Sequence, residues 1–274
     1  GFYFSTLNIN IASTMSYFFN RLEVYTLYFL EYVKHGEWSA LVNAFRFMFS
    51  RKSHWRGGRI RSSMGVFDTR KNSLDFQYVN YAYEIQIKRF IERESFDVFL
   101  DIGACLGEYC IWLGRKGKRC FAFEPVKVSF DMIERNIRLN EVGQHVKAFN
   151  YGLGLKHSLE YFEMDITNPG SNRRVDAPGE HTERFEINAL DDTLHELNLK
   201  ETDRVLIKID VEGMELDMLH GAAGFLKRFP HIVLIIEEKF SGESNIRNGL
   251  STIADFEYGK IDEHNIYARK RHSL

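Results

Sequence analysis

The stretch that decides the fold is Asp97 to Tyr109, DVFLDIGACLGEY. It begins with a short apolar run that ends at Asp101, passes Gly103 and Gly107, and returns to residues that favour a helix. Such a run is typical of a parallel strand covered on both faces, and a glycine turn lets a ligand approach the N–H groups of the next helix. The stretch therefore predicts a strand, a turn and a helix around a ligand.

The glycine spacing of this turn excludes the dinucleotide fingerprint. That fingerprint, G-x-G-x-x-G, needs a second glycine where this chain has Cys105. The spacing therefore disfavours a nicotinamide dehydrogenase. A tight strand-to-helix connection without a ligand remains the alternative for the turn on its own.

Three further apolar runs also end in acids, at residues 120–124, 205–210 and 232–237. The carboxyl ends of parallel strands meet at one edge of a sheet, where ligands bind, so these acids are expected on one rim. Glu124 follows the glycines by about 20 residues, the distance at which a carboxylate meets a ribose in nucleotide-binding units. The alternation of strands and helices predicts an α/β fold with a doubly wound, mostly parallel sheet.

The last two extended segments, 256–261 and 265–268, are joined by a short polar turn. Two strands so close together predict an antiparallel hairpin at the end of the sheet.

Five motifs follow one another between about residues 83 and 269: DIGACLGEY, AFEP, ALDD, IKIDVEGMELDMLHGA and IIEE. In this order they closely resemble the FkbM family of S-adenosylmethionine-dependent O-methyltransferases. The resemblance implies a Rossmann-like fold with a seven-stranded sheet, a methyl donor that becomes S-adenosylhomocysteine, and a hydroxyl acceptor on a sugar, glycan or related natural product. It divides the chain into an N-terminal part, residues 1–79, and a methyltransferase domain, residues 80–274.

The resemblance also implies which residues bind the donor. Glu124 is expected at the ribose hydroxyls, Asp101 and the glycines of the turn on the methionine side, and Asn150 at the adenine. The expected set is Tyr83, Glu84, Asp101, Gly103, Ala104, Gly107, Glu108, Glu124, Pro125, Asn150, Tyr151 and Asp210.

The candidate catalytic residues follow from the chemistry of methyl transfer to a hydroxyl, which requires alignment of the reactants and removal of a proton. Strand alternation places Lys208 and Asp210 on one face, as a catalytic pair or as a structural ion pair. Alternatively, Asp210 and Glu212, with Glu237 or Glu238, hold a divalent cation that lowers the pKa of the hydroxyl. The sequence leaves the base and the metal open.

The candidate substrate residues lie in the polar stretch 165–184, DITNPGSNRRVDAPGEHTER. A long irregular segment in a compact domain is usually functional or disordered. Its NPGS resembles a family loop that faces the acceptor, and we expect Arg173, Arg174 and His181 to contact the substrate.

The N-terminal part is rich in aromatic residues. Helical spacing within residues 15–33 and again within 38–49 predicts two helices, which we expect to pack on the core or on a second copy of the chain. The alternatives are an aromatic platform for a sugar and a membrane-surface patch. Residues 64–79 are predicted to form a hairpin around 69–73, and residues 80–93 a helix over the cofactor cleft.

The basic stretch 51–61, RKSHWRGGRIR, surrounds Trp55 with cations. A solvated linker is one interpretation. A clamp for a phosphorylated or nucleotide-linked substrate is the other, because guanidinium groups bind phosphate and tryptophan stacks on sugars or bases.

The composition indicates a globular chain of 274 residues, 44% of them hydrophobic, with a net charge of −2. This balance argues against nucleic acid as a partner, and hence against an RNA ribose 2′-O-methyltransferase, while a non-catalytic cofactor-binding module is a further alternative. The three cysteines are predicted to be reduced thiols, and no run reaches the roughly 18 apolar residues of a membrane helix. We therefore expect a cytoplasmic protein with a small-molecule or glycan acceptor, nucleotide-linked or lipid-linked.

Overall fold

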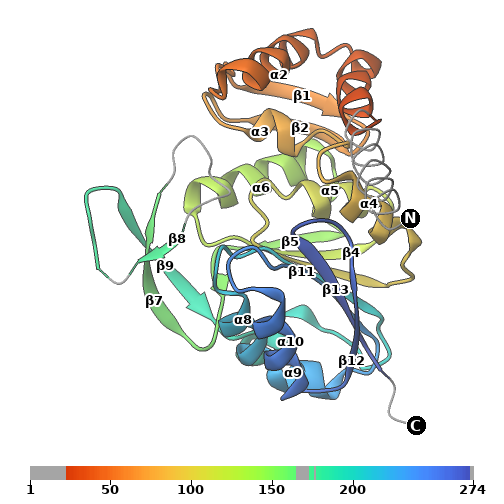
Figure 1. Cartoon of the computed structure of the whole chain (residues 1–274), viewed down its shortest axis with the longest axis vertical. Coiled ribbons are helices and arrows are strands. Elements are labelled where there is room, and N and C mark those ends of the chain that lie inside the picture. The colour runs from red at the N-terminus through yellow and green to blue at the C-terminus, as the bar shows by residue number, and fades with distance from the viewer. Residues whose placement is uncertain (1–22, 165–172, 176, 272–274) are drawn as a thin grey trace, which may run out of the picture.

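The computed structural model describes residues 23–164, 173–175 and 177–271. Its centre is a seven-stranded sheet in the order β12-β13-β11-β10-β3-β4-β5 (Figure 1). Strand β10, at the centre of the sheet, pairs in parallel with β11 and with β3. Among the strands of this sheet, only β13 runs antiparallel to its partners. The predicted sheet with a terminal antiparallel pair is confirmed. The strands are β3 (Val98–Ile102), β4 (Arg119–Phe123), β5 (Val146–Phe149), β10 (Val205–Ile209), β11 (Ile232–Glu237), β12 (Phe256–Lys260) and β13 (Asn265–Lys270).

Both faces of this sheet are covered by helices (Figure 1). On one face lie α4 (Ile85–Arg93), α5 (Glu108–Gly114) and α6 (Lys127–Leu139); α8 (Glu215–Gly221), α9 (Ala223–Arg228) and α10 (Glu243–Ser251) lie on the other. Every residue of β3 and β10 is buried. Near-continuous apolar runs are therefore required in these strands, which explains why the sequence pattern located them correctly.

The N-terminal elements stack on the helical layer α4 to α6 (Figure 1). They are a helix seen over residues 23–35, α2 (Trp38–Ser50), the hairpin β1 (Gly58–Ser62) with β2 (Gly65–Thr69), and α3 (Asp75–Tyr78). Two side chains of the α6 end fix the hairpin, because Asn140 and Asn136 accept hydrogen bonds from the N–H groups of Val66 and Asp68 at 2.9 and 2.8 Å.

The prediction for the hairpin was wrong, and the structure disfavours the clamp, one of the two interpretations of residues 51–61. The hairpin does not turn at 69–73 but at Ser63 and Met64, directly before Gly65, and the chain after Thr69 leads into a helix. Trp55 is not available for stacking on a ligand: it is 5% exposed, and its indole N–H donates to Thr69 Oγ1 at 2.9 Å. Burial of the apolar surface of this ring fixes it in the core, which argues against the clamp interpretation.

A second, four-stranded sheet stands at the side of the domain, in the order β6-β9-β7-β8 (Figure 1). Its strands are β6 (Gly152–Leu153), β7 (Ser158–Glu163), β8 (Arg173–Val175) and β9 (Thr182–Asn188). The stretch predicted to be irregular thus contains β8 and the start of β9, while its NPGS loop lies outside the described residues. The chain returns to the central sheet through α7 (Leu190–Thr193) and the 3₁₀ turn η1 (Leu194–Leu197).

The cysteines are free thiols, as predicted, with Cys110 and Cys120 buried and Cys105 half-buried. Among the described residues, no helix has the length and apolar character needed to cross a lipid bilayer.

Candidate active site

The turn after β3 is pressed against the end of β10. Gly103 has a φ of +87°, and a Cβ placed on it would lie 1.9 Å from the carbonyl oxygen of Asp210. The N–H of Asp210 donates in return to the carbonyl of Ile102 at 3.0 Å. Only glycine combines this backbone conformation with this approach, so the turn and the acid at the end of β10 are positioned together.

Glu124 ties the same turn to the end of β4. Its two carboxylate oxygens accept hydrogen bonds from the N–H groups of Cys105 and Val126, both at 2.9 Å. Burial raises the pKa of Glu124 to about 7, although these two backbone donors act to lower it. Asn150, the expected adenine residue, donates its amide to the carbonyls of Glu124 and Pro125 at 3.0 and 3.1 Å. In this structure Asn150 therefore holds the carboxyl end of β4.

A first pocket, lined in part by Glu124, encloses about 590 Å³, including space open to solvent. Its walls are mainly apolar. Phe162 and Ile187 come from β7 and β9, so the side sheet forms part of the wall. Neither residue was predicted as a site residue. The lining consists of Gly103, Cys105, Glu124, Pro125, Val126, Gly152, Leu153, Phe162, Ile187, Asp210, Val211, Glu212 and Met214.

A second pocket of about 680 Å³ is strongly polar and shares one wall with the first. Gly103, Cys105, Asp210 and Glu212 line both. The remainder of its lining consists of Tyr78, Tyr83, Glu84, Glu108, Lys208, Glu237 and Lys239.

The predicted pair of Lys208 and Asp210 is present, with 2.8 Å between Lys208 Nζ and Asp210 Oδ2. Lys208 is 5% exposed. Burial acts to lower the pKa of its ammonium group, but the negative charges of Asp210, Glu84 and Asp101 outweigh it and raise this pKa well above its usual value. A buried cation is thus maintained beside the Asp210 carboxylate.

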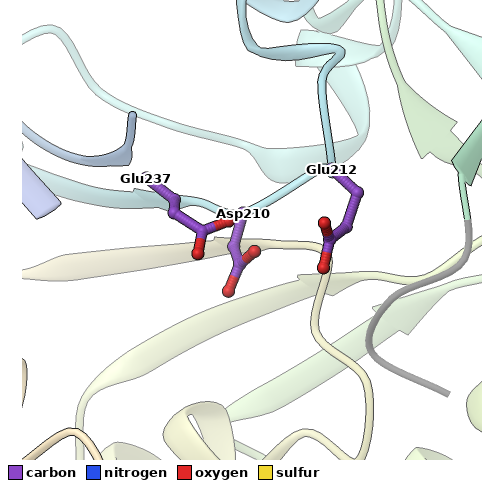
Figure 2. Close-up of side chains that lie close together, drawn as sticks. All are labelled: Asp210, Glu212 and Glu237. Atoms are coloured by element: carbon purple, nitrogen blue, oxygen red, sulfur yellow. The ribbon is translucent and has the colours of Figure 1, made fainter. Parts of the chain in front are cut away.

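Three carboxyl groups, those of Asp210, Glu212 and Glu237, gather at the carboxyl ends of β10 and β11 (Figure 2). One oxygen from each lies within 4.8 Å of the others. Burial, followed by the charge of Asp210, raises the pKa of Glu212 to about 7 and that of Glu237 to about 8. The alternative ligand Glu238 is not in this group, since it pairs with Lys260. The group suits either a shared proton or a divalent cation.

A network of buried side chains contacts the residues that line the polar pocket. The hydroxyl of Tyr109 donates to Glu84 Oε2 at 2.7 Å, and Lys88 donates to the carbonyl of Tyr83. The Nζ atoms of Lys88 and Lys208 lie 4.8 and 5.3 Å from the centre of the Tyr109 ring. Lys88 and Tyr109 were not predicted, although Lys88 stands on the apolar face of its helix, which is a usable signal.

Asp101 is 1% exposed, and neither of its carboxylate oxygens has a hydrogen-bond partner among the described residues. Burial raises its pKa to about 6 and that of Glu108 to about 8. An unpartnered buried carboxyl is costly, and the charge it presents favours a cationic ligand nearby.

The expected donor-binding residues divide by position. Tyr83, Glu84, Gly103, Glu108, Glu124, Pro125 and Asp210 line one or both pockets, while Asp101, Ala104, Gly107, Asn150 and Tyr151 surround them without lining either. The donor set fits S-adenosylmethionine: an acid for a ribose diol, apolar walls for an adenine, and carboxylates for a sulfonium and an ammonium group.

The expected substrate residues lie apart from both pockets. Arg174 pairs with Asp217 of α8 at 2.8 Å, and His181 is exposed at the start of the β9 hairpin. Neither lines either pocket. The side chain of Arg173 is outside the described part, so substrate contact by these residues stays a prediction.

The fold is an α/β fold with a mostly parallel sheet, and acids gather at the carboxyl ends of its strands. The Methyltransferase FkbM domain matches residues 101–263, and the chain belongs to this family. The predicted family is thereby confirmed, and this family assignment agrees with S-adenosylmethionine as the cofactor.

Among the relatives is methyltransferase sdnD of Sordaria araneosa, 31% identical over 154 residues, which are 44% of this chain and 59% of that protein. Hexuronic acid methyltransferase AglP of Haloferax volcanii is 27% identical over 53% of this chain and 58% of its own. The chain thus spans less than two thirds of either. A solved structure, methyltransferase FkbM from Methylobacillus flagellatus, has 17% identity and a TM-score of 0.47, with 71% of this chain and 53% of that one covered.

At about pH 8, above the Glu124 pKa of about 7, replacement of Glu124 by Gln is expected to weaken S-adenosylhomocysteine binding about tenfold or more, because a charged acceptor for the ribose hydroxyls becomes neutral. Isothermal titration measures the affinity. Glu186→Gln, at an exposed position of β9, is the matched control. An unchanged affinity in Glu124→Gln would remove Glu124 from the donor site.

Proposed function

We propose that the protein is an S-adenosylmethionine-dependent O-methyltransferase that acts on a hydroxyl group of a sugar, a glycan or a related natural product. The observation that carries the proposal is the wall of Gly103, Cys105, Asp210 and Glu212 that the two pockets share, because Lys208 pairs with Asp210 there and Glu237 lines the polar pocket beside it. A donor that reaches from the first pocket into the second would place its methyl group at this wall, beside an acceptor in the rest of the polar pocket.

The donor is held by residues of both pockets in this proposal. Glu124 receives the ribose hydroxyls, the apolar first pocket receives the adenine, and Glu84 and Glu108 face the methionyl part. S-adenosylmethionine, when bound, supplies an electrophilic methyl group. The backbone at Gly103 can approach it closely, since no Cβ intervenes.

The acids of the shared wall handle the proton of the acceptor hydroxyl. Lys208 orients the Asp210 carboxylate through the 2.8 Å contact. Glu212 and Glu237 have pKa values of about 7 and about 8, close to the pH at which a general base is most effective. A divalent cation on Asp210, Glu212 and Glu237 would serve the same step by lowering the pKa of the hydroxyl.

A sugar acceptor is supported by two observations. The second pocket is polar, with carboxylates, lysines and tyrosine hydroxyls that suit a molecule with many hydroxyl groups. In addition, one relative is named hexuronic acid methyltransferase.

The turnover rate is expected to rise between about pH 6 and about pH 8.5, because the carboxyl groups of Glu212 and Glu237 must lose their protons to act as a base or as metal ligands. Glu237→Gln should remove the upper part of this rise. The pH profile of kcat, recorded with EDTA and again with Mg²⁺, separates the two roles: a rate that EDTA abolishes identifies a metal. A flat profile would contradict both.

The acceptor class is tested by methyl transfer from radiolabelled S-adenosylmethionine. Hexuronic acids, neutral glycosides and capped RNA are offered in parallel, with the Asp210→Asn variant as the blank. We expect label in the sugar fraction. Label on RNA alone would overturn the sugar acceptor and leave the methyltransferase activity intact.

A further inference from the structure

A third cavity lies between the N-terminal helices and the active site. It occupies about 680 Å³, including space open to solvent, among the helix of residues 23–35, α2 and the segment before α4. Its walls are largely aromatic and aliphatic, and its polar side chains are few. The lining is Val24, Tyr25, Tyr28, Phe29, Ala44, Phe47, Met48, Arg51, Gln77, Ala82, Tyr83 and Glu84.

This cavity shares a wall with the polar pocket of the active site. Tyr83 and Glu84 line both spaces. Burial raises the pKa of the Tyr83 hydroxyl well above its usual value, and the charges of Glu84 and Asp210 add to the rise, which places Tyr83 within the electrostatic field of the active site. A ligand in the apolar cavity is therefore a neighbour of the catalytic acids.

The shared wall is held in one conformation. Glu84 adopts a φ of 50°, a left-handed conformation that is strained for a residue with a side chain. The Tyr109 hydroxyl donates to its carboxylate, and Lys88 donates to the carbonyl of Tyr83. The ring of Tyr78 packs on that of Tyr83 with 5.4 Å between centroids. Strain held by a buried network is typical of functional positions.

We propose that this cavity binds the apolar part of the acceptor, an alkyl or aryl aglycone, while the sugar that carries the reactive hydroxyl occupies the polar pocket beyond Tyr83 and Glu84. The inference rests on the proposed function and specifies its substrate class as an amphiphilic glycoside. A free sugar would leave the apolar walls in contact with water, whereas an aglycone buries them.

The test compares octyl β-glucoside, below its micellar concentration, with methyl β-glucoside by isothermal titration into protein saturated with S-adenosylhomocysteine. Each additional buried methylene strengthens binding about fourfold, so the octyl compound is expected to bind at least about 50-fold more tightly. Met48→Trp fills the cavity from α2 and should abolish this preference. Val42→Trp, on the exposed face of the same helix, is the matched control and should retain it.

Failure of the inference is distinguishable from failure of the proposed function. S-adenosylhomocysteine binding by each variant reports on folding and on the donor site. If the wild type does not bind S-adenosylhomocysteine, the proposed function is contradicted at its donor site, whatever the result with the octyl compound. Should Met48→Trp not bind it, Ala44→Leu fills the same cavity with less volume. The inference is overturned if the wild type shows no octyl preference, if the filled variants keep it, or if Val42→Trp alone loses it.

Discussion

Asn in place of Asp210 is expected to lower kcat by about a thousandfold while the affinity for S-adenosylhomocysteine changes less than about threefold. The substitution keeps the shape of the side chain but removes the charge that faces Lys208 at 2.8 Å, and with it the orientation of a proton acceptor at the shared wall. Loss of general-base catalysis typically costs 10²- to 10⁴-fold. Single-turnover methyl transfer measures the rate, and titration measures the affinity.

A matched lysine and aspartate pair on the surface serves as the control for this experiment. Lys127 and Asp131 are one helical turn apart on α6, and both are exposed. Asp131→Asn removes the same charge and is expected to leave kcat unchanged, because exposed ion pairs contribute little. A fully active Asp210→Asn enzyme would show that the pair with Lys208 is structural.

Replacement of Gly103 by Ala is expected to destabilise the protein by at least about 3 kcal/mol and to abolish donor binding. The added Cβ would lie 1.9 Å from the carbonyl oxygen of Asp210, so the turn and the end of β10 have to separate. For a chain of this size, the midpoint of thermal unfolding should fall by about 6 °C or more. Thermal melts with and without S-adenosylhomocysteine measure both effects.

Gly117 provides the control that separates crowding from backbone strain. Its φ is +79°, close to that of Gly103, but an added Cβ would meet no atom within 4 Å. Gly117→Ala is therefore expected to cost only about 1 kcal/mol and to leave donor binding intact. Equal losses in the two variants would show that the contact with Asp210 is not the cause.

The central fold was predictable because its strands are buried on both faces. β3 and β10 lack any exposed residue, so their sequences are near-continuous apolar runs, with Asp101 and Asp210 at their carboxyl ends. The rim of acids followed from topology alone, since parallel strands bring their carboxyl ends to one edge. Elements with one face in solvent, such as the hairpin of β1 and β2, have a weaker sequence pattern. The turn of this hairpin was therefore predicted too close to the C-terminus.

The parts of the site that escaped prediction depend on contacts between distant segments. Phe162 and Ile187 enter the first pocket only because the side sheet folds back on the domain. Lys88 is separated from Lys208 by more than a hundred residues, yet both ammonium groups approach the ring of Tyr109. The two interpretations of the stretch around Trp55 stayed open for the same reason, since its partner Thr69 is reached through the hairpin. Local periodicity contains no information on such neighbours.

The side sheet has a consequence for how enzymes of this architecture diversify. Strands β7 and β8 pair only within the side sheet, and β9 joins it to the short β6, so the register of the seven central strands does not depend on their length. Substitutions at Phe162 of β7 or Ile187 of β9 therefore reshape one wall of the first pocket while the rim of acids stays fixed. Changes in the side sheet can therefore alter ligand preference while the seven-stranded core folds as before.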